Sequence, residues 1–255
     1  MYKVFSRTQC MSHLTRLFDA AVHATKEVDR SCSVTPNACF AYGNVEGGLT
    51  IALLGTVEIG IGRSMKKDSY TNFKDLMAGE KLDKDYTIES RRMANSLVAI
   101  VAPHGGTIEP MTDEIADRIA GNEFSFYAFR ALKRNSGLHV KSTLFDEPSC
   151  LDMLATHERA LSIHGWDASE ARVCIGGRDK QLMLALKNDL GKAGITVEDA
   201  AGQLRGSDPR NIVNRCKTGA GVQFELTMEF RENARLADSF VQVIRSALSH
   251  LKNDS

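Results

Sequence analysis

The sequence has no excess of charge of either sign, no long hydrophobic run and no regular cysteine spacing. Lys plus Arg balances Asp plus Glu at 32 each in 255 residues, so no overall field attracts nucleic acid or a membrane surface. The best membrane candidate, Leu49 to Ile61, is too short to span a bilayer and contains Glu58. Lys3 and Arg7 are not followed by the apolar segment of a secretory signal. We therefore expect neither nucleic acid nor membrane as a partner, and the sequence defines no oligomeric state.

The six cysteines include no Cys-x-x-Cys pair. A chain of this length is stable without crosslinks, so we interpret them as reduced thiols of a cytoplasmic protein. An N-terminal metal site is conceivable, but the spacing of its candidate ligands matches no zinc pattern. These candidates are Cys10, His13, His23, Cys32 and Cys39.

The composition, 43% hydrophobic and 25% charged, is that of an ordinary globular protein. The length permits one domain or two. Residues 1–64 are rich in Ser, Thr, Asn and Gly and show only weak patterns, so we expect them to be an N-terminal extension. Residues 65–255 are then the catalytic domain, and Met65 is a possible alternative start.

Strand and helix patterns alternate through the second part of the chain. Apolar runs bounded by Gly or Pro predict strands at 97–103, 124–129, 138–140, 160–165, 172–175, 195–198 and 221–226. Helical spacing and capping residues predict helices at 111–120, 146–157, 179–192 and 231–251, while 69–87 suggests loop with a short helix. This alternation predicts an α/β fold with an open, mostly parallel sheet and helices on both faces.

The segment from Ala102 to Glu109 is the strongest functional signal. A buried strand delivers His104 into a bend containing two glycines, and Glu109 follows five residues later. A neutral imidazole and a carboxylate suit divalent zinc, but a catalytic zinc usually takes three protein ligands. The alternative is a turn histidine bonded to the backbone.

His164 and Glu225 also lie near the downstream ends of predicted strands. Ligands of open α/β sheets bind outside the carboxyl ends of the strands, so these side chains can converge on His104. Glu225 alternates with Phe224 and Leu226 and points away from the apolar face. Taken alone, His164 resembles a satisfied core histidine and Glu225 a salt-bridged surface residue.

Many short motifs, in order from about Tyr70 to Arg231, resemble the poly-γ-glutamate hydrolase family of phages and bacteria. They include Ala102-Pro103-His104-Gly105-Gly106, Ile108-Glu109-Pro110, Phe145-Asp146-Glu147-Pro148, Ile163-His164-Gly165, Asn211-Ile212-Val213-Asn214-Arg215 and Gly221-Val222-Gln223-Phe224-Glu225-Leu226. The resemblance implies a zinc hydrolase with a carboxypeptidase-like α/β core that cleaves γ-glutamyl amide bonds.

Carried over by position, the resemblance implies that His104, Glu109 and His164 hold Zn²⁺ and that Glu225 is the catalytic carboxylate. Asn214 and Arg215 are similar to the pair with which carboxypeptidase-like enzymes hold a substrate carboxylate. The planar guanidinium of Arg215 suits an acidic polymer or peptide. Other cations that extend the cleft in this interpretation are Arg130, Lys141, Arg178 and Arg231. Departures from the family pattern at Lys141, Val213 and Phe224 bear on substrate preference.

Two alternatives remain open at this stage. One is a related zinc amidohydrolase that acts on N-acyl amino acids or on cell-wall γ-glutamyl links. The other is a catalytically inactive binding module with a structural metal. Glu225 argues against the module, because a structural site needs no additional carboxylate opposite the metal.

Overall fold

The computed structural model describes residues 40–45, 48–53, 70–133 and 137–251. The chain divides into two units, Met1–Ser64 and Met65–Ser255. In the first unit, β1 (Phe40–Val45) and β2 (Gly48–Leu53) form an antiparallel hairpin. The cysteines and histidines between residues 10 and 39 lie outside the described residues. That residues 1–64 are an extension separate from the catalytic fold stays a prediction.

The second unit contains a seven-stranded sheet with the order β3-β5-β4-β6-β9-β7-β8. Its strands are β3 (Tyr86–Arg91), β4 (Val98–Gly106), β5 (Ser125–Ala131), β6 (Arg159–Trp166), β7 (Val173–Gly177), β8 (Val197–Asp199) and β9 (Val222–Thr227). The four neighbours β5, β4, β6 and β9 are parallel, whereas β3 and β7 pair antiparallel with β5 and β9. The predicted α/β fold with a mostly parallel sheet is confirmed.

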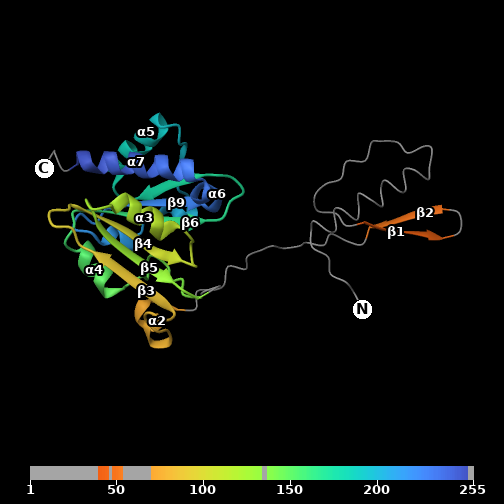
Figure 1. Cartoon of the computed structure of the whole chain (residues 1–255), viewed down its shortest axis with the longest axis horizontal. Helices are drawn as coiled ribbons and strands as arrows, with labels where there is room; N and C mark the ends of the chain where they lie inside the picture. The colour runs from red at the N-terminus through yellow and green to blue at the C-terminus, as the bar shows by residue number, and fades with distance from the viewer. Residues whose placement is uncertain (1–39, 46–47, 54–69, 134–136, 252–255) are drawn as a thin grey trace. The chain divides into compact units, whose positions relative to one another are not determined.

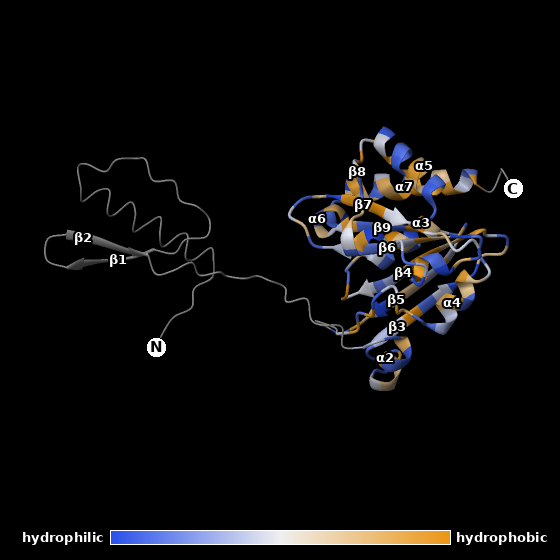
Figure 2. Cartoon of the chain, turned by 180° about the vertical axis from the view of Figure 1, so that it is seen from behind, coloured by the Kyte–Doolittle hydropathy of each residue, from blue (hydrophilic) through white to orange (hydrophobic). Residues whose placement is uncertain are grey.

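Helices cover both faces of this sheet (Figure 1). They are α2 (Phe73–Gly79), α3 (Thr112–Ala120), α4 (Pro148–Leu154), α5 (Lys180–Lys192), α6 (Met228–Glu232) and α7 (Ala234–His250), with 3₁₀ helices η1 (Gly202–Arg205) and η2 (Ile212–Arg215). Apolar residues of α3, α5, α6 and α7 pack on one face, and those of α2, α4 and η2 pack on the other. Hydrophobic and hydrophilic residues share the helices α5 and α7 (Figure 2), as expected for helices with one buried side.

Capping residues set several helix ends where the sequence predicts them. Asp179 accepts a hydrogen bond from the Leu182 amide at the start of α5. Gly121 follows α3 with a positive φ of 49°, a conformation that glycine adopts at little cost. The predicted boundaries of α3 and α5 therefore agree with the structure.

Two strand predictions are wrong. Residues 138–140 form no strand, because the Val140 carbonyl turns to the His104 ring instead of a ladder. β3 is absent from the prediction, which has loop there. Most of its residues are only half-buried, since it is an edge strand with mixed polar side chains and lacks a clear apolar run.

Two helix predictions also need correction. Glu147, not Asp146, caps α4 by accepting from the amides of Ser149 and Cys150, and the helix ends at Leu154 rather than His157. Asp146 accepts from the Phe73 amide instead.

The predicted helix 231–251 is divided into α6 and α7. Asn233 interrupts it because its side chain caps α7 through the Leu236 amide, a role that Asn strongly favours.

No helix in the described residues is long and apolar enough to cross a membrane. Cys150, Cys174 and Cys216 are buried free thiols.

His157 is a structural histidine with a predicted pH signature. Its ring contacts the Met153 carbonyl and the Ser125 hydroxyl, and burial lowers its pKa below the usual value. A lowered folded-state pKa means that the unfolded chain binds the proton first. His157 therefore removes stability as the pH falls through the ordinary histidine pKa of about 6.5.

We expect the His157 imidazole to take up its proton at a lower pH in the folded protein than in the urea-unfolded chain, as measured by NMR titration of both states. A folded-state midpoint at or above that of the unfolded chain would contradict this assignment.

Candidate metal centre and active site

His104, Glu109 and His164 form one compact cluster whose potential ligand atoms lie within 4.8 Å of one another. The two Nδ1 atoms of His104 and His164 are 3.1 Å apart. The Glu109 oxygens lie 2.9 Å from His104 Nδ1 and 3.4 Å from His164 Nδ1. Both histidines are only 2% exposed. Two imidazoles and a carboxylate thus converge in a buried place where they can hold a metal ion.

A β-bulge in β4 explains how His104 reaches the cluster. Ala102 pairs with Ala128, and Gly105 pairs with Arg130. Between these pairs, β4 advances by three residues while β5 advances by two, so β4 contains one extra residue. Strict alternation places His104 on the same face as Ala102. The extra residue rotates its ring to the other face, toward His164, as bulges beside functional sites commonly do.

The two glycines after His104 fit a crowded turn. A Cβ on Gly105 would lie 2.7 Å from Asp113 Cβ, and Gly106 has a φ of +66°, which a side chain rarely tolerates. The Glu109 amide bonds back to the His104 carbonyl at 2.9 Å. The turn therefore folds Glu109 back onto the ring of His104.

Backbone groups orient the three cluster residues. The Val140 carbonyl accepts a hydrogen bond from His104 Nε2 at 2.8 Å. The Gly165 amide donates to Glu109 Oε2 at 2.8 Å. His164 Nε2 is buried without a hydrogen-bond partner among the described residues, so only its Nδ1 takes part in the cluster. Such outer contacts fix ligand orientation in metal sites.

Glu225 is the direct partner of His164 in the pairing of β6 with β9. Its side chain therefore lies on the same face of the sheet, and it is only 5% exposed. Gln223 Nε2 donates to Glu225 Oε1 at 2.7 Å, and Asn211 donates to Gln223 Oε1 at 3.0 Å. This chain of buried amides fixes one carboxylate oxygen beside the cluster.

The two carboxyl groups have pKa values shifted in opposite directions. Burial raises the pKa of Glu225 well above its usual value, and the charge of Glu109 adds to the rise. Burial also acts to raise the pKa of Glu109, but the adjacent His104 and His164 outweigh it and hold that pKa below its usual range. Glu109 is therefore the anionic member of the cluster, and Glu225 is a carboxyl group able to carry a proton.

Residues 70–241 match the family model described as poly-gamma-glutamate hydrolase. The chain belongs to this family of hydrolases. It is 36% identical over 168 residues to the SPbeta prophage-derived UPF0714 protein YoqZ of Bacillus subtilis (strain 168), covering 64% of this chain and 60% of YoqZ. It is also 36% identical over 171 residues to UPF0714 protein YndL of the same strain, covering 66% of this chain and 67% of YndL. The chain thus matches less than two thirds of the length of YoqZ.

Two solved structures resemble this member of the poly-gamma-glutamate hydrolase family closely. A bacteriophage poly-gamma-glutamate hydrolase superposes with a TM-score of 0.70 and 31% identity, covering 74% of this chain and all of that one. The zinc-free, apo structure of YndL superposes with a TM-score of 0.67 and 31% identity, covering 72% of this chain and 99% of YndL. The match to the whole of the phage enzyme indicates that the second unit contains its complete fold.

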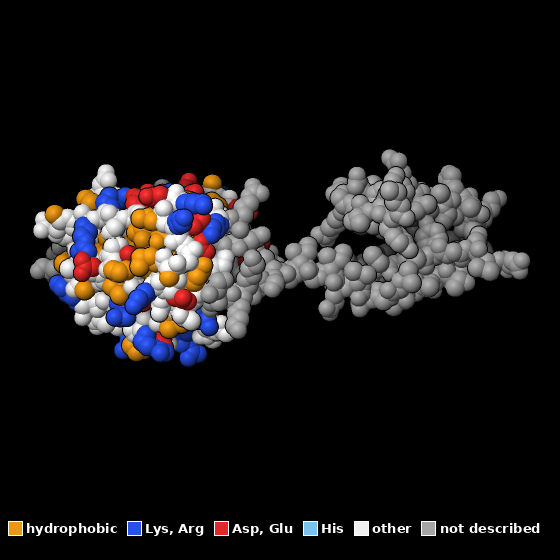
Figure 3. Space-filling view, turned by 90° about the horizontal axis from the view of Figure 1, so that it is seen from below, with side chains coloured by type: hydrophobic (Ala, Val, Ile, Leu, Met, Phe, Trp, Pro, Cys, Tyr) orange, Lys and Arg blue, Asp and Glu red, His pale blue; other side chains and the backbone are white. Residues whose placement is uncertain are grey.

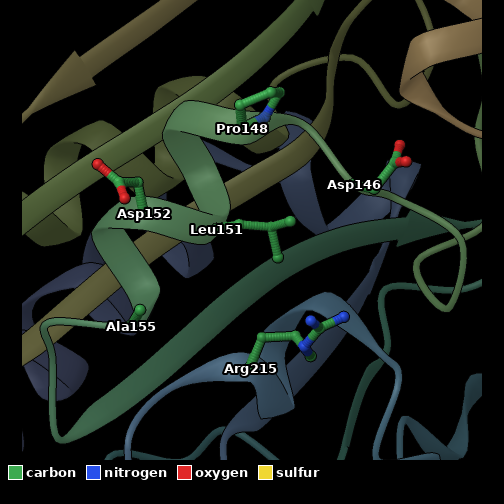
Figure 4. A pocket seen from close by; sticks show the side chains of 6 residues that line it. All are labelled: Asp146, Pro148, Leu151, Asp152, Ala155 and Arg215. Carbon is green, nitrogen blue, oxygen red and sulfur yellow. The ribbon is translucent and has the colours of Figure 1, made fainter.

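Asn214 and Arg215, also predicted from the family resemblance, form no hydrogen bond or ion pair with the cluster among the described residues. The buried Asn214 amide donates to the carbonyls of Gly206 and Asp208, both at 2.8 Å, and Asn214 accepts from the Gly221 amide. Arg215 is exposed and lines a pocket of about 390 Å³ beside α4, with Asp146 and Asp152 (Figure 4). No residue of the cluster of His104, Glu109 and His164 lines this pocket. The role of Asn214 and Arg215 in substrate binding stays a prediction.

Two further residues near the site have contacts that the sequence did not predict. The His139 ring lies 4.2 Å from the His104 ring between centroids. Arg231, expected only as a cleft cation, is 3% exposed and packs against Gly165. Neither follows a strand signal of the kind that identifies His164, so spacing alone could not find them.

The cluster predicts that His164→Ala loses bound divalent metal. Loss of a residue that hydrogen-bonds to a metal ligand lowers metal affinity by up to about 100-fold. Removal of one of the three ligands themselves should therefore lower metal affinity by at least about 100-fold. Metal content after dialysis measures the loss, and His250→Ala, at the exposed end of α7, is the matched control. Wild-type metal content in His164→Ala would remove this residue from the coordination sphere.

Proposed function

We propose that the chain is a zinc-dependent hydrolase that cleaves the γ-glutamyl amide bonds of poly-γ-glutamate. Support comes from the family match, the similarity to the phage poly-gamma-glutamate hydrolase and the convergence of His104, Glu109 and His164. The zinc-free description of the YndL structure supports zinc as the ion.

The observation that carries the proposal is the orientation of His104. Its Nε2 faces the Val140 carbonyl, which only accepts hydrogen bonds, so a ring with a single proton carries that proton there. The lone pair of Nδ1 then faces a Glu109 oxygen at 2.9 Å. Two acceptors this close require a positive charge between them. His164 Nδ1 turns to the same place, which favours a metal ion over a proton.

The spacing of these atoms fits zinc. Zinc binds imidazole nitrogen and carboxylate oxygen at about 2.0–2.2 Å in tetrahedral sites, which separates neighbouring ligand atoms by roughly 3.3 Å. The three separations here are 2.9, 3.1 and 3.4 Å. Three protein ligands also leave a fourth position for water or substrate, as in catalytic sites.

When bound, zinc supplies polarisation of the scissile carbonyl and lowers the pKa of water to about 7. Glu225 accepts the proton of the attacking water and returns it to the leaving nitrogen. Its burial beside His164 suits both steps, because burial raises the pKa of this carboxyl group and so makes it a better proton acceptor than an exposed carboxylate. Gln223 holds one oxygen of this carboxyl group in place.

Local cations, rather than the overall surface, recognise the acidic substrate in this proposal. The face in Figure 3 mixes basic, acidic and apolar side chains. Within the described part of the chain, Arg215 joins no ion pair, although Asp146 and Asp152 line the same pocket. We assign it to a substrate carboxylate, and Asn214 supports the segment that carries it.

The function itself is tested by incubating zinc-loaded protein with poly-γ-glutamate and following chain length. Shorter products, lost on zinc removal and restored by zinc, are expected. N-acyl amino acids serve as the competing substrate class. Cleavage of those compounds but not of the polymer would overturn the substrate assignment.

Glu225→Gln should retain zinc and lose at least about 10²-fold in kcat, because the amide cannot transfer the proton. Zinc content and polymer cleavage measure the two effects. Glu229→Gln is the matched control, since Glu229 is exposed on α6. Near wild-type turnover of Glu225→Gln would refute the assigned role.

Arg215→Ala should raise KM for poly-γ-glutamate by roughly 10- to 100-fold, the value of one charge-assisted hydrogen bond of about 1.5–3 kcal/mol. Zinc content should not change. Arg210→Ala, which removes an exposed arginine paired with Asp208, is the control. Equal KM values for both variants would exclude Arg215 from substrate binding.

A further inference from the structure

Arg231 contacts the backbone beside the site on three separate segments. Its Nη1 donates to the carbonyl of Pro110, which follows Glu109, and its Nε donates to the carbonyl of Thr227 at 3.3 Å, two residues beyond Glu225. Its guanidinium also packs against Gly165, which follows His164. One buried side chain thus touches the chain next to two cluster residues and near Glu225.

Gly165 leaves the space that this arrangement requires. A Cβ at Gly165 would lie 2.7 Å from Arg231 Cζ and from Nη2, closer than real Cβ contacts come. The backbone of Gly165 has no left-handed φ, so steric contact with Arg231 is the physical reason to have glycine here. The Gly165 amide binds Glu109 at 2.8 Å. The guanidinium therefore joins the same two segments as this hydrogen bond.

The geometry of the guanidinium suits this task. Its planar group presents several fixed N–H donors, which reach two carbonyls while a face packs on Gly165. At 3% exposure the side chain has few alternative positions. A lysine keeps the charge but has a single nitrogen, so it cannot reproduce these contacts.

We propose that Arg231 is a positioning residue that holds the Glu109 turn and the ends of β6 and β9 together, so that the metal ligands and Glu225 meet at one point. The inference rests on the proposed zinc site, and Gly165 is its structural counterpart. Outer partners of metal ligands typically contribute about 10- to 100-fold to metal affinity or activity.

The test is a double-mutant cycle on the full chain with Arg231→Met, Gly165→Ala and the combined variant. Zinc affinity from chelator competition is the primary readout, with kcat and melting temperature in excess zinc alongside. Each single variant should lose about 10- to 100-fold in zinc affinity. The combined variant should lose no more than the worse single one, because the added methyl group acts by displacing Arg231. Arg231→Lys should not rescue affinity.

Matched controls separate positioning from general stability. Gly191→Ala adds a methyl group that meets no atom within 4 Å. Arg245→Met removes another arginine that binds carbonyls, those of Arg118 and Ile119. It should lower the melting temperature without changing zinc affinity.

Wild-type zinc affinity in either single variant, or losses that multiply in the combined variant, would overturn the proposal. If Arg231→Met does not fold, Gly165→Ala against Gly191→Ala decides the question by zinc affinity. This readout needs no substrate. A chain that binds zinc as expected but leaves poly-γ-glutamate intact would refute the proposed function and leave this test valid.

Discussion

Three parallel strands that end at one edge of the sheet carry the residues of the site, and their alignment is the constraint on which the site depends. The ladder between β6 and β9 places His164 opposite Glu225, so the backbone sets the spacing between this imidazole and the neighbouring carboxyl group. β4 needs a bulge to join them, because strict alternation turns His104 to the wrong face. The same irregularity starts the crowded turn that returns Glu109 to the imidazole. The register of the strands and the single bulge in β4 thus set the positions of the site residues.

Burying two carboxyl groups at one site costs free energy unless neighbouring groups stabilise the protonation state of each one. Glu109 has the two imidazoles and the Gly165 amide, which favour its anion. Burial and the nearby negative charge of Glu109 raise the pKa of Glu225 and favour its neutral form, and they outweigh the amide donor from Gln223, which favours the anion. The same residue type is therefore anionic in one position and favours its protonated form in the other. Environment, rather than residue identity, makes this division.

The central strands were predictable because each is an apolar run that ends in Gly, Pro or a polar residue, and buried parallel strands have that signature. His164 and Glu225 could be placed by counting along such strands. The edge strand β3 could not, since its half-buried residues lack the pattern. The bulge and the packing of Arg231 on Gly165 depend on contacts between distant segments. The convergence of His104 and His164 was therefore expected from the order of the strands. The bulge and the side-chain packing that produce this convergence are seen only in the three-dimensional structure.

In the proposed function, the depth of the cluster restricts how a polymer reaches it. Both histidines are almost completely buried, and the Glu109 side chain is the most exposed of the three at 15%. Only a short reacting segment can approach such a centre, so the remainder of a long substrate must contact the surrounding surface. That surface has no overall positive charge to attract a polyanion, since the chain has zero formal net charge, and exposed charges are screened beyond about 8–10 Å at physiological salt. In that proposal, recognition of an acidic polymer requires individual cations close to its carboxylates, and an arginine outside any ion pair of the residues that the structure describes, such as Arg215, is better suited to this than those already engaged with acidic neighbours.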